Sequence, residues 1–228
     1  MLSPFEIEAL WLSLKVALWA IAWILPLGLA VAWLLARREF PGKSLLNGIV
    51  HLPLVVPPVV VGYFLLVVLG RNGVVGGWLD ETFAITFSFS WRGAAVAAGV
   101  MAFPLMVRTI RLSLEGMDRR LETAARTLGA RPWDVFLTVT LPLISPGIVA
   151  GVILSFARCL GEFGATITFA ANVPGETRTL PLAIYSALQT PGGEAAVTRL
   201  ALIAILVAVL ALAASEILAR RLAKRIEA

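Results

Sequence analysis

Long stretches without charged residues constrain the fold of this chain more than any other feature. Residues 16–36 contain no charged side chain, and neither do residues 135–157. A helix of about 20 apolar residues is long enough to cross the hydrocarbon core of a bilayer. The sequence therefore predicts that both runs are transmembrane helices.

Three further segments complete the expected set of spans. Residues 45–70 are apolar but interrupted by prolines, residues 91–112 contain one proline, and residues 197–218 precede a basic terminus. The chain is 59% hydrophobic and 14% charged, whereas soluble domains are about 45–50% apolar and about 25% charged. We therefore predict an all-α integral membrane protein with a single transmembrane domain, residues 1–228, and about five transmembrane helices.

Two long connections are harder to assign. Residues 71–90 hold several glycines and two acids, so we expect an external loop with little regular structure, with a short hairpin around residues 83–89 as an option. Within residues 159–198, the uncharged run 163–175 is too short to span a bilayer. This connection is compatible with half-inserted segments facing a pore, with an external cap, or with a sixth short span.

The basic residues predict the orientation of the chain. The connection after the first span, the polar stretch from 108 to 134 and the C-terminus hold three, six and four Lys or Arg residues. Such clusters stay on the cytoplasmic side of a membrane. Five spans then place the N-terminus outside and the C-terminus in the cytoplasm. The basic residues flank apolar spans, as topology signals do, so the net charge of +5 does not indicate binding of nucleic acid. As a membrane protein, the chain is expected to contact membrane lipid.

Several kinds of chemistry are excluded by what the sequence lacks. Cys159 and His51 are the only residues of their types, which excludes an internal disulfide and a site built on paired histidines or cysteines. No glycine-rich loop with the spacing GxxxxGK[ST] is present, so the chain does not bind ATP through such a loop. We expect no metal site, no cofactor and no enzymatic activity in this chain.

The stretch between the third and fourth expected spans is the longest polar segment that fits a helix. Asp118 can cap its start, and Glu122 lies in the first turn, where the helix dipole favours an acid. Gly129 can end the helix in a left-handed conformation, and Pro132 prevents its continuation. The sequence therefore predicts a short amphipathic helix over residues 118–130.

The spacing around this helix resembles the EAA loop of ABC importer permeases. Ala124-Ala125 is followed after three residues by Gly129, and Val139 and Leu141-Pro142 follow at the spacing of that loop. The chain departs from the pattern at Thr123, because the acid stands one residue earlier. In that family the loop forms a cytoplasmic coupling helix that docks on the ATP-binding subunit. The resemblance implies a coupling role for Glu122, Ala124, Ala125, Leu128, Gly129, Leu141 and Pro142.

A longer resemblance extends over residues 41–199. The segments HLPLVVPPVVVGYFLLVVLG, SWRGAAVAAGVMAFPLMVRTIRLSLEG and FARCLGEFGATITFAANVPGETRTLPLAIY are similar to those of molybdate ABC transporter permeases. This implies the type I ABC importer permease fold, in a bacterial cytoplasmic (inner) membrane, as a homodimer. It also implies two ATP-binding subunits, which carry ATP and Mg, and a periplasmic or extracellular molybdate-binding protein.

Two alternatives remain open at this stage. Sulfate and tungstate permeases are similar to molybdate permeases, and no residue of this sequence distinguishes the three oxyanions. A secondary carrier that needs no ATP usually contains two related halves with discontinuous helices. This chain has one EAA-like loop and no internal repeat, which favours the ABC importer permease.

The candidates for a translocation path are residues at kinks and at one span end. Phe103 is a bulky ring among small residues and could close a constriction, or it could pack against lipid. Glu162 could repel an idle anion, or it could be solvated; Arg158, four residues earlier, could pair with it on one helix face. The complete candidate set for the path and gate is Phe103, Pro104, Gly161, Glu162, Pro57 and Pro58.

Overall fold

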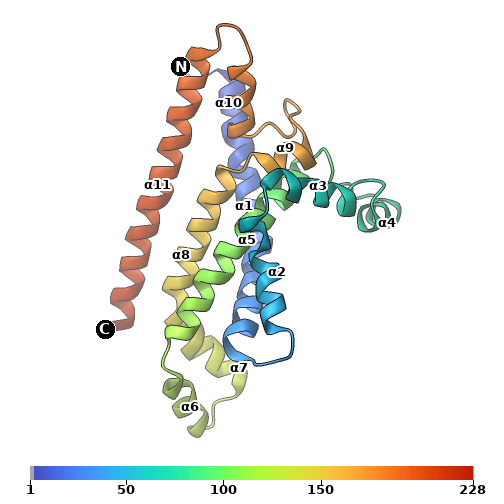
Figure 1. The fold of residues 1–228 in the computed structure, drawn as a ribbon. Coiled ribbons are helices and arrows are strands. Elements are labelled where there is room, and N and C mark those ends of the chain that lie inside the picture. The colour runs from blue at the N-terminus through green and yellow to red at the C-terminus, as the bar shows by residue number, and fades with distance from the viewer. Residues whose placement is uncertain (1–2, 228) are drawn as a thin grey trace.

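The computed structural model describes residues 3–227, and all regular structure among them is helical. Figure 1 shows a tall bundle with the N-terminus at one end and a small peripheral helix, α6, at the other. The elements are α1 (Pro4–Arg37), α2 (Lys43–Val55), α3 (Pro58–Leu69), α4 (Val74–Phe83), α5 (Trp91–Gly116), α6 (Arg119–Thr127), α7 (Pro132–Val135), the π-helix η1 (Phe136–Thr140), α8 (Leu141–Leu160), α9 (Gly164–Ala170), α10 (Leu180–Leu188) and α11 (Glu194–Glu227).

The expected number of spans is confirmed. Four helical stretches are long and apolar enough to cross a membrane: α1, α5, the continuous run from α7 to α8, and residues 194–214 of α11. The pair α2 and α3 can count as a fifth span, although its two halves are bent by 117°. Helices α9 and α10 have seven and nine residues, so neither crosses a bilayer alone and the sixth span is not found among residues 3–227.

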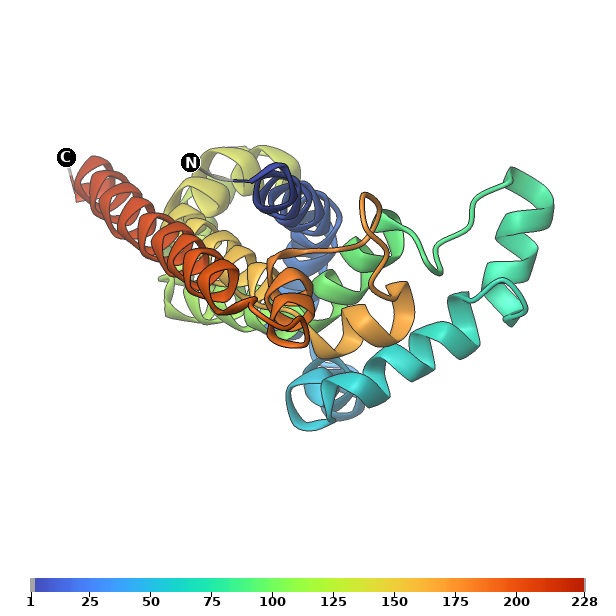
Figure 2. The same cartoon turned by 90° about the horizontal axis from the view of Figure 1, so that it is seen from above.

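The second expected span is sharply broken. We predicted one interrupted helix over residues 45–70, but α3 leaves the direction of α2 and runs outward from the bundle (Figure 2). A residue before proline avoids the helical conformation, and two such residues occur in succession: Val56 and Pro57 have ψ angles of 138° and 134°. Pro53, in contrast, is accommodated inside α2.

The prediction for residues 71–90 was wrong in part. This connection contains α4, and no hairpin forms around residues 83–89. Glycine makes the helix possible, because a Cβ at Gly76 would collide with the backbone carbonyls of Leu69 and Gly70 at the end of α3. Asp80 holds the helix to its flanks by accepting hydrogen bonds from Thr86 (2.8 Å) and Arg71 (3.1 Å), and these two contacts, with that from Thr86 the larger, lower the pKa of Asp80.

The core lies where α1, α5 and α8 pack together, and small side chains allow the closest approach of these helices. In α5, Ala94, Ala98 and Ala102 are almost fully buried. A Cβ at Gly99 would collide with the ring of Trp23 in α1. Close approach through small residues is the usual way in which membrane helices pack, because lipid provides no hydrophobic drive for association.

The segment after α8 is packed against protein at the end of the bundle opposite α6. α9 buries Ala165 and Phe169 completely and crosses α3 at Gly62, where a Cβ would lie 2.7 Å from the carbonyl oxygen of Ala165. α10 packs beside the first turns of α1 and the start of α11. Of the three interpretations of this segment, the structure supports short helices packed against protein.

The N-terminal end is joined to α11 by an ion pair. Glu6 is fully buried, forms a capping box with Ser3, and accepts a hydrogen bond from Nε of Arg199 at 2.7 Å. Apart from this end and the contact with α8, residues 194–214 of α11 have few neighbours, since only 6% of their apolar window is buried. Most of this part of α11 is therefore available to lipid or to another chain.

Candidate functional site

The short helix α6 lies at the end of the molecule opposite the N-terminus (Figure 1) and forms as predicted. The side chain of Asp118 caps it by accepting a hydrogen bond from the backbone N–H of Arg120 at 2.9 Å. Gly129 follows the helix with a φ of +91°, in the left-handed region. A Cβ there would meet nothing within 4 Å, so the backbone conformation alone favours glycine at this position.

No residue of α6 is buried, and its apolar side chains face outward. Leu121 is 48% exposed, and Leu128, at the helix end, is 89% exposed. Ala124 is exposed and Ala125 is half-buried. Two exposed leucines on a helix at the periphery of the bundle form an apolar surface that is suited to docking on another protein.

Glu122 ties this helix to the bundle. Its Oε1 atom accepts hydrogen bonds from the guanidinium of Arg37 at 2.9 Å and from the hydroxyl of Thr140 at 2.7 Å. The side chains of Arg37 and Glu122 are only 9% and 17% exposed. One carboxylate thus connects the last turn of α1, the helix α6 and the π-helix η1. Arg119 adds a second contact to α1, donating to the carbonyl oxygen of Ala36 at 3.1 Å.

The Leu-Pro pair of the motif lies where η1 passes into α8. The N–H of Leu141 bonds to the carbonyl of Phe136, five residues back. Pro142 has no N–H and its ring would clash with a carbonyl four residues earlier in a regular helix. A π-turn relieves such a clash, and the same turn carries Thr140 to Glu122. The sequence analysis did not identify Thr140 as a partner of Glu122. It counted Arg37 only among the three basic residues after the first span that predict the orientation of the chain.

The candidates for the path and gate that follow α8 lie in the half of the bundle away from α6. Arg158 and Glu162 form an ion pair of 2.6 Å, and the side chain of Glu162 is 2% exposed. Glu162 also accepts a hydrogen bond from the backbone N–H of Ala165 at 2.8 Å. The pairing considered from their spacing is therefore present. Of the two interpretations of Glu162, the solvated carboxylate does not fit this environment, because the side chain is buried and paired with Arg158. Gly161 beside it is exposed.

Phe103 and Glu162 are not brought together. Phe103 is half-buried against the core of α1 and α5, and Pro104 is buried inside α5. Cys159 of α8 contacts the carbonyl of Ala98, and the chain continues away from Phe103 before it reaches Glu162. The two candidates are therefore separated by about two helical turns along the bundle.

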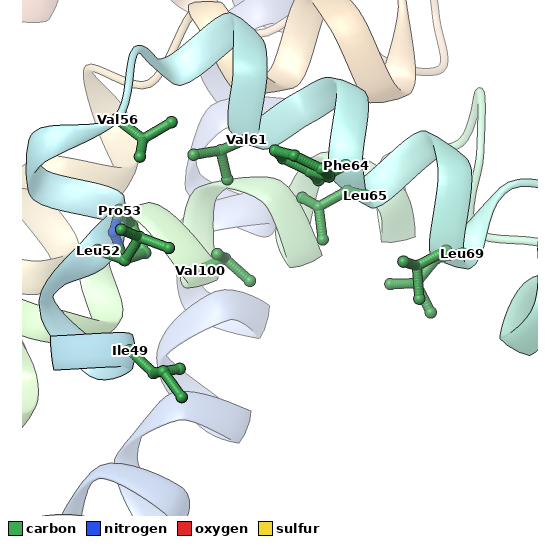
Figure 3. A pocket seen from close by; sticks show the side chains of 10 residues that line it. Ile49, Leu52, Pro53, Val56, Val61, Phe64, Leu65, Leu69 and Val100 are labelled. Carbon is green, nitrogen blue, oxygen red and sulfur yellow. The ribbon is translucent and has the colours of Figure 1, made fainter. Parts of the chain in front are cut away.

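Pro57 and Pro58 shape an apolar pocket at the bend between α2 and α3. Figure 3 shows side chains from α2 and α3 facing one another across it, with Val100 of α5 at its floor. The pocket has a volume of about 370 Å³ and is lined by aliphatic and aromatic residues together with Pro53. It offers no charged group to an anion.

The membrane spans and the peripheral helix α6 together define a class of membrane transport protein. Residues 24–225 match the family model described as binding-protein-dependent transport system inner membrane component, and the chain belongs to this family. It is the multi-pass permease subunit in the inner membrane, not the ATPase, and it works with an ATPase and a periplasmic binding protein.

Among its relatives are two molybdenum transport system permease proteins, both named ModB. The protein of Escherichia coli K12 is 60% identical over 219 residues, which cover 96% of each chain. The protein of Haemophilus influenzae is 57% identical over 221 residues, which cover 97% of this chain and 96% of that one. The sulfate transport system permease CysT of Escherichia coli is 44% identical over 162 residues, which cover 71% and 58%.

Solved structures show the same fold. A chain of a bacterial alginate ABC transporter matches with a TM-score of 0.73 at 19% identity, covering 98% of this chain and 80% of that one. A chain of the MetNI methionine ABC transporter also matches with a TM-score of 0.73, at 16% identity, covering 97% and 99%. These matches confirm the ABC importer permease fold expected from the sequence.

Proposed function

We propose that this chain is the permease of a molybdate importer. The observation that supports this most strongly is the 60% identity to a molybdenum permease over 96% of both chains. A sulfate permease is the second candidate, because CysT is 44% identical over its shorter matched region. Tungstate is the third candidate, since it is a tetrahedral oxyanion of the same charge.

The coupling route that we propose begins at the exposed leucines of α6. An ATP-binding subunit that holds Leu121 and Leu128 would move α6 when it binds or hydrolyses ATP. Because Glu122 contacts Arg37 and Thr140, that movement would reach α1 and η1 together. From η1 it would pass into α8, whose outer end carries Arg158 and Glu162.

We further infer that two copies of the chain form the pathway with two ATP-binding subunits. The apolar faces of α3 and α11 are largely exposed, and a second copy would cover part of them. The candidates for the gate stay the same: Phe103 and Pro104 within α5, Gly161 and Glu162 after α8, and Pro57 and Pro58 at the bend.

The test of this function is ATP hydrolysis by the reconstituted complex. The permease, its ATP-binding subunit and the binding protein are placed in proteoliposomes. Hydrolysis is then measured with binding protein loaded with molybdate, tungstate or sulfate. Stimulation by molybdate-loaded protein is expected. Stimulation by sulfate alone would contradict the molybdate assignment, and no stimulation by any loaded protein would contradict the importer itself.

Replacing Gly129 with valine is expected to weaken attachment of the ATP-binding subunit. A β-branched residue in the left-handed conformation costs roughly 1 kcal/mol or more, so the chain after α6 would leave in another direction. Pull-down of the ATP-binding subunit measures the effect. Gly129→Asn, which tolerates this conformation, should retain more binding, and Gly48→Val in α2, where a Cβ meets nothing, should retain all of it. Equal pull-down by all three variants would remove Gly129 from the coupling role.

The orientation that we propose has α6 in the cytoplasm and the N-terminus outside. Cys159 is buried, and a Cys159→Ser background removes it from labelling altogether. Single reporters Gln189→Cys, between α10 and α11, and Arg120→Cys, in α6, are both at exposed positions. An impermeant maleimide added to intact cells should label only the first. Labelling of the second from outside would reverse the orientation.

A further inference from the structure

A large open cavity lies between the last turns of α1, the helix α6 and the α7–η1 segment. Its volume is about 1140 Å³, three times that of the apolar pocket at the bend, at about 370 Å³. Neither the coupling contacts nor the gate candidates require a cavity here. Its lining combines arginines from the end of α1 and from α6 with apolar residues of α1, α7 and η1. We call the part around the arginines the basic end, and the part around Pro26, Leu29 and Ala30 of α1 the apolar end.

The basic end is rich in arginine. Arg37, Arg38, Arg119 and Arg126 line it, with Glu122 as the single acid. The carboxylate of Glu122 is already bound by Arg37, so it does not neutralise the remaining three. Arg119 and Arg126 are exposed on α6, and Arg38 is exposed just after α1. An anion is the ligand that this end of the cavity lacks.

The apolar end extends along α1 towards the membrane interior. Pro26, Leu29 and Ala30 line it, and the distance from Pro26 to Arg37 along the helix is about 16 Å at 1.5 Å per residue. Trp33 lies between Pro26 and Arg37 along α1, and Trp133 of α7 also lines the cavity. Arg38 sits over the ring of Trp33 at 5.6 Å. Tryptophan is enriched at the depth of the lipid headgroups.

We propose that this cavity binds an anionic phospholipid of the cytoplasmic leaflet. The headgroup phosphate would lie among the four arginines, and an acyl chain would follow Leu29 towards Pro26. A free oxyanion would use only the basic end and leave most of the volume and the whole apolar end empty. Basic pockets between membrane helices on the cytoplasmic side are suited to acidic headgroups. The assignment to that leaflet rests on the proposed orientation of the permease.

A bound lipid would touch both halves of the coupling route. Arg37 and Arg38 belong to α1, and Arg119 and Arg126 belong to α6. The same headgroup would therefore bridge the transmembrane bundle and the helix that contacts the ATP-binding subunit.

Native mass spectrometry of the purified permease–ATPase complex tests the proposal. Dioleoyl phosphatidylglycerol and dioleoyl phosphatidylcholine are titrated into the wild type, into Arg38→Gln/Arg126→Gln, and into the control Arg71→Gln/Arg92→Gln. The control removes two exposed arginines at the outer end of the molecule. The wild type should prefer phosphatidylglycerol at one saturable site per permease chain. The first double variant should bind it about thirtyfold more weakly, for the loss of two basic contacts, and the control should match the wild type.

Further arms separate the lipid from other anions and from the importer function. Sodium molybdate or inorganic phosphate at millimolar concentration should leave the bound lipid in place. Displacement by either would show a site for soluble anions and overturn the lipid assignment. Equal binding of both lipids, or equal binding by both double variants, would overturn it as well. Because lipid retention is measured without ATP or substrate, a permease that proves to carry sulfate would still give the expected lipid result.

Discussion

Glu122→Ala is expected to abolish ATP-driven uptake and to destabilise the membrane domain. The substitution leaves the guanidinium of Arg37, which is 9% exposed, without its carboxylate. Removing one partner of a buried ion pair costs about 3–5 kcal/mol, because the remaining charge stays in a poorly solvated site. The hydroxyl of Thr140 loses its acceptor in the same step. The helix α6 would then be attached to the bundle by its two chain connections and by Arg119.

A double-mutant cycle measures this effect. Thermal unfolding in detergent is followed for Glu122→Ala, Arg37→Met and the combined variant. The combined variant should be more stable than Glu122→Ala alone, because no unpaired charge is left behind. Glu122→Gln should lie between these and the wild type, since an amide oxygen can still accept from Arg37 and Thr140.

The matched control is the exposed pair of Lys43 and Glu39, in which the glutamate is 88% exposed. Glu39→Ala should change stability by less than about 1 kcal/mol and leave uptake unchanged. If Glu122→Ala and Glu39→Ala have the same unfolding temperature and the same uptake, the contact with Arg37 does not hold the coupling helix. If it unfolds earlier but uptake per folded complex is unchanged, the pair stabilises the fold without a role in coupling.

Arg158→Ala is expected to have an effect of similar size at the opposite end of α8. It leaves Glu162, which is 2% exposed, as an unpaired buried carboxylate, for which about 3–5 kcal/mol is again the expected cost. Glu162→Gln removes the charge but keeps an oxygen that can accept from the N–H of Ala165. It should therefore cost less than Arg158→Ala.

The same variants test the proposed gate. Anion flux without ATP is measured in proteoliposomes for Arg158→Ala, Glu162→Gln and Phe103→Ala. A raised leak in the variants at the α8 end would place the constriction there, and a raised leak in Phe103→Ala alone would place it deeper in the bundle. The combination Arg158→Ala/Glu162→Gln should recover part of the stability lost by Arg158→Ala. No recovery would mean that the charge of Glu162 is not the cause of the loss, and normal leak in every variant would place the gate at other residues.

Local patterns in the sequence were sufficient for the elements that depend on neighbouring residues. Uncharged runs predicted the positions of α1 and α8, and a largely apolar run predicted α11, because burying a charge in lipid is costly at any place in the fold. Asp118 and Gly129 bounded α6 correctly, because capping and left-handed conformations involve only the adjacent backbone. The spacing of the EAA-like loop was enough to indicate the ABC importer permease.

Contacts between distant segments were decided only by the tertiary structure. The helix α4 was missed because glycine usually marks a loop, whereas here Gly76 permits contact with the end of α3. The 117° bend between α2 and α3 was underestimated, because prolines show where a helix breaks but not the direction in which the chain continues. Arg37 and Thr140 lie 85 and 18 residues from Glu122, and no periodic pattern connects them. Their meeting depends on the packing of α1 against α5 and α8, which is a property of the assembled bundle.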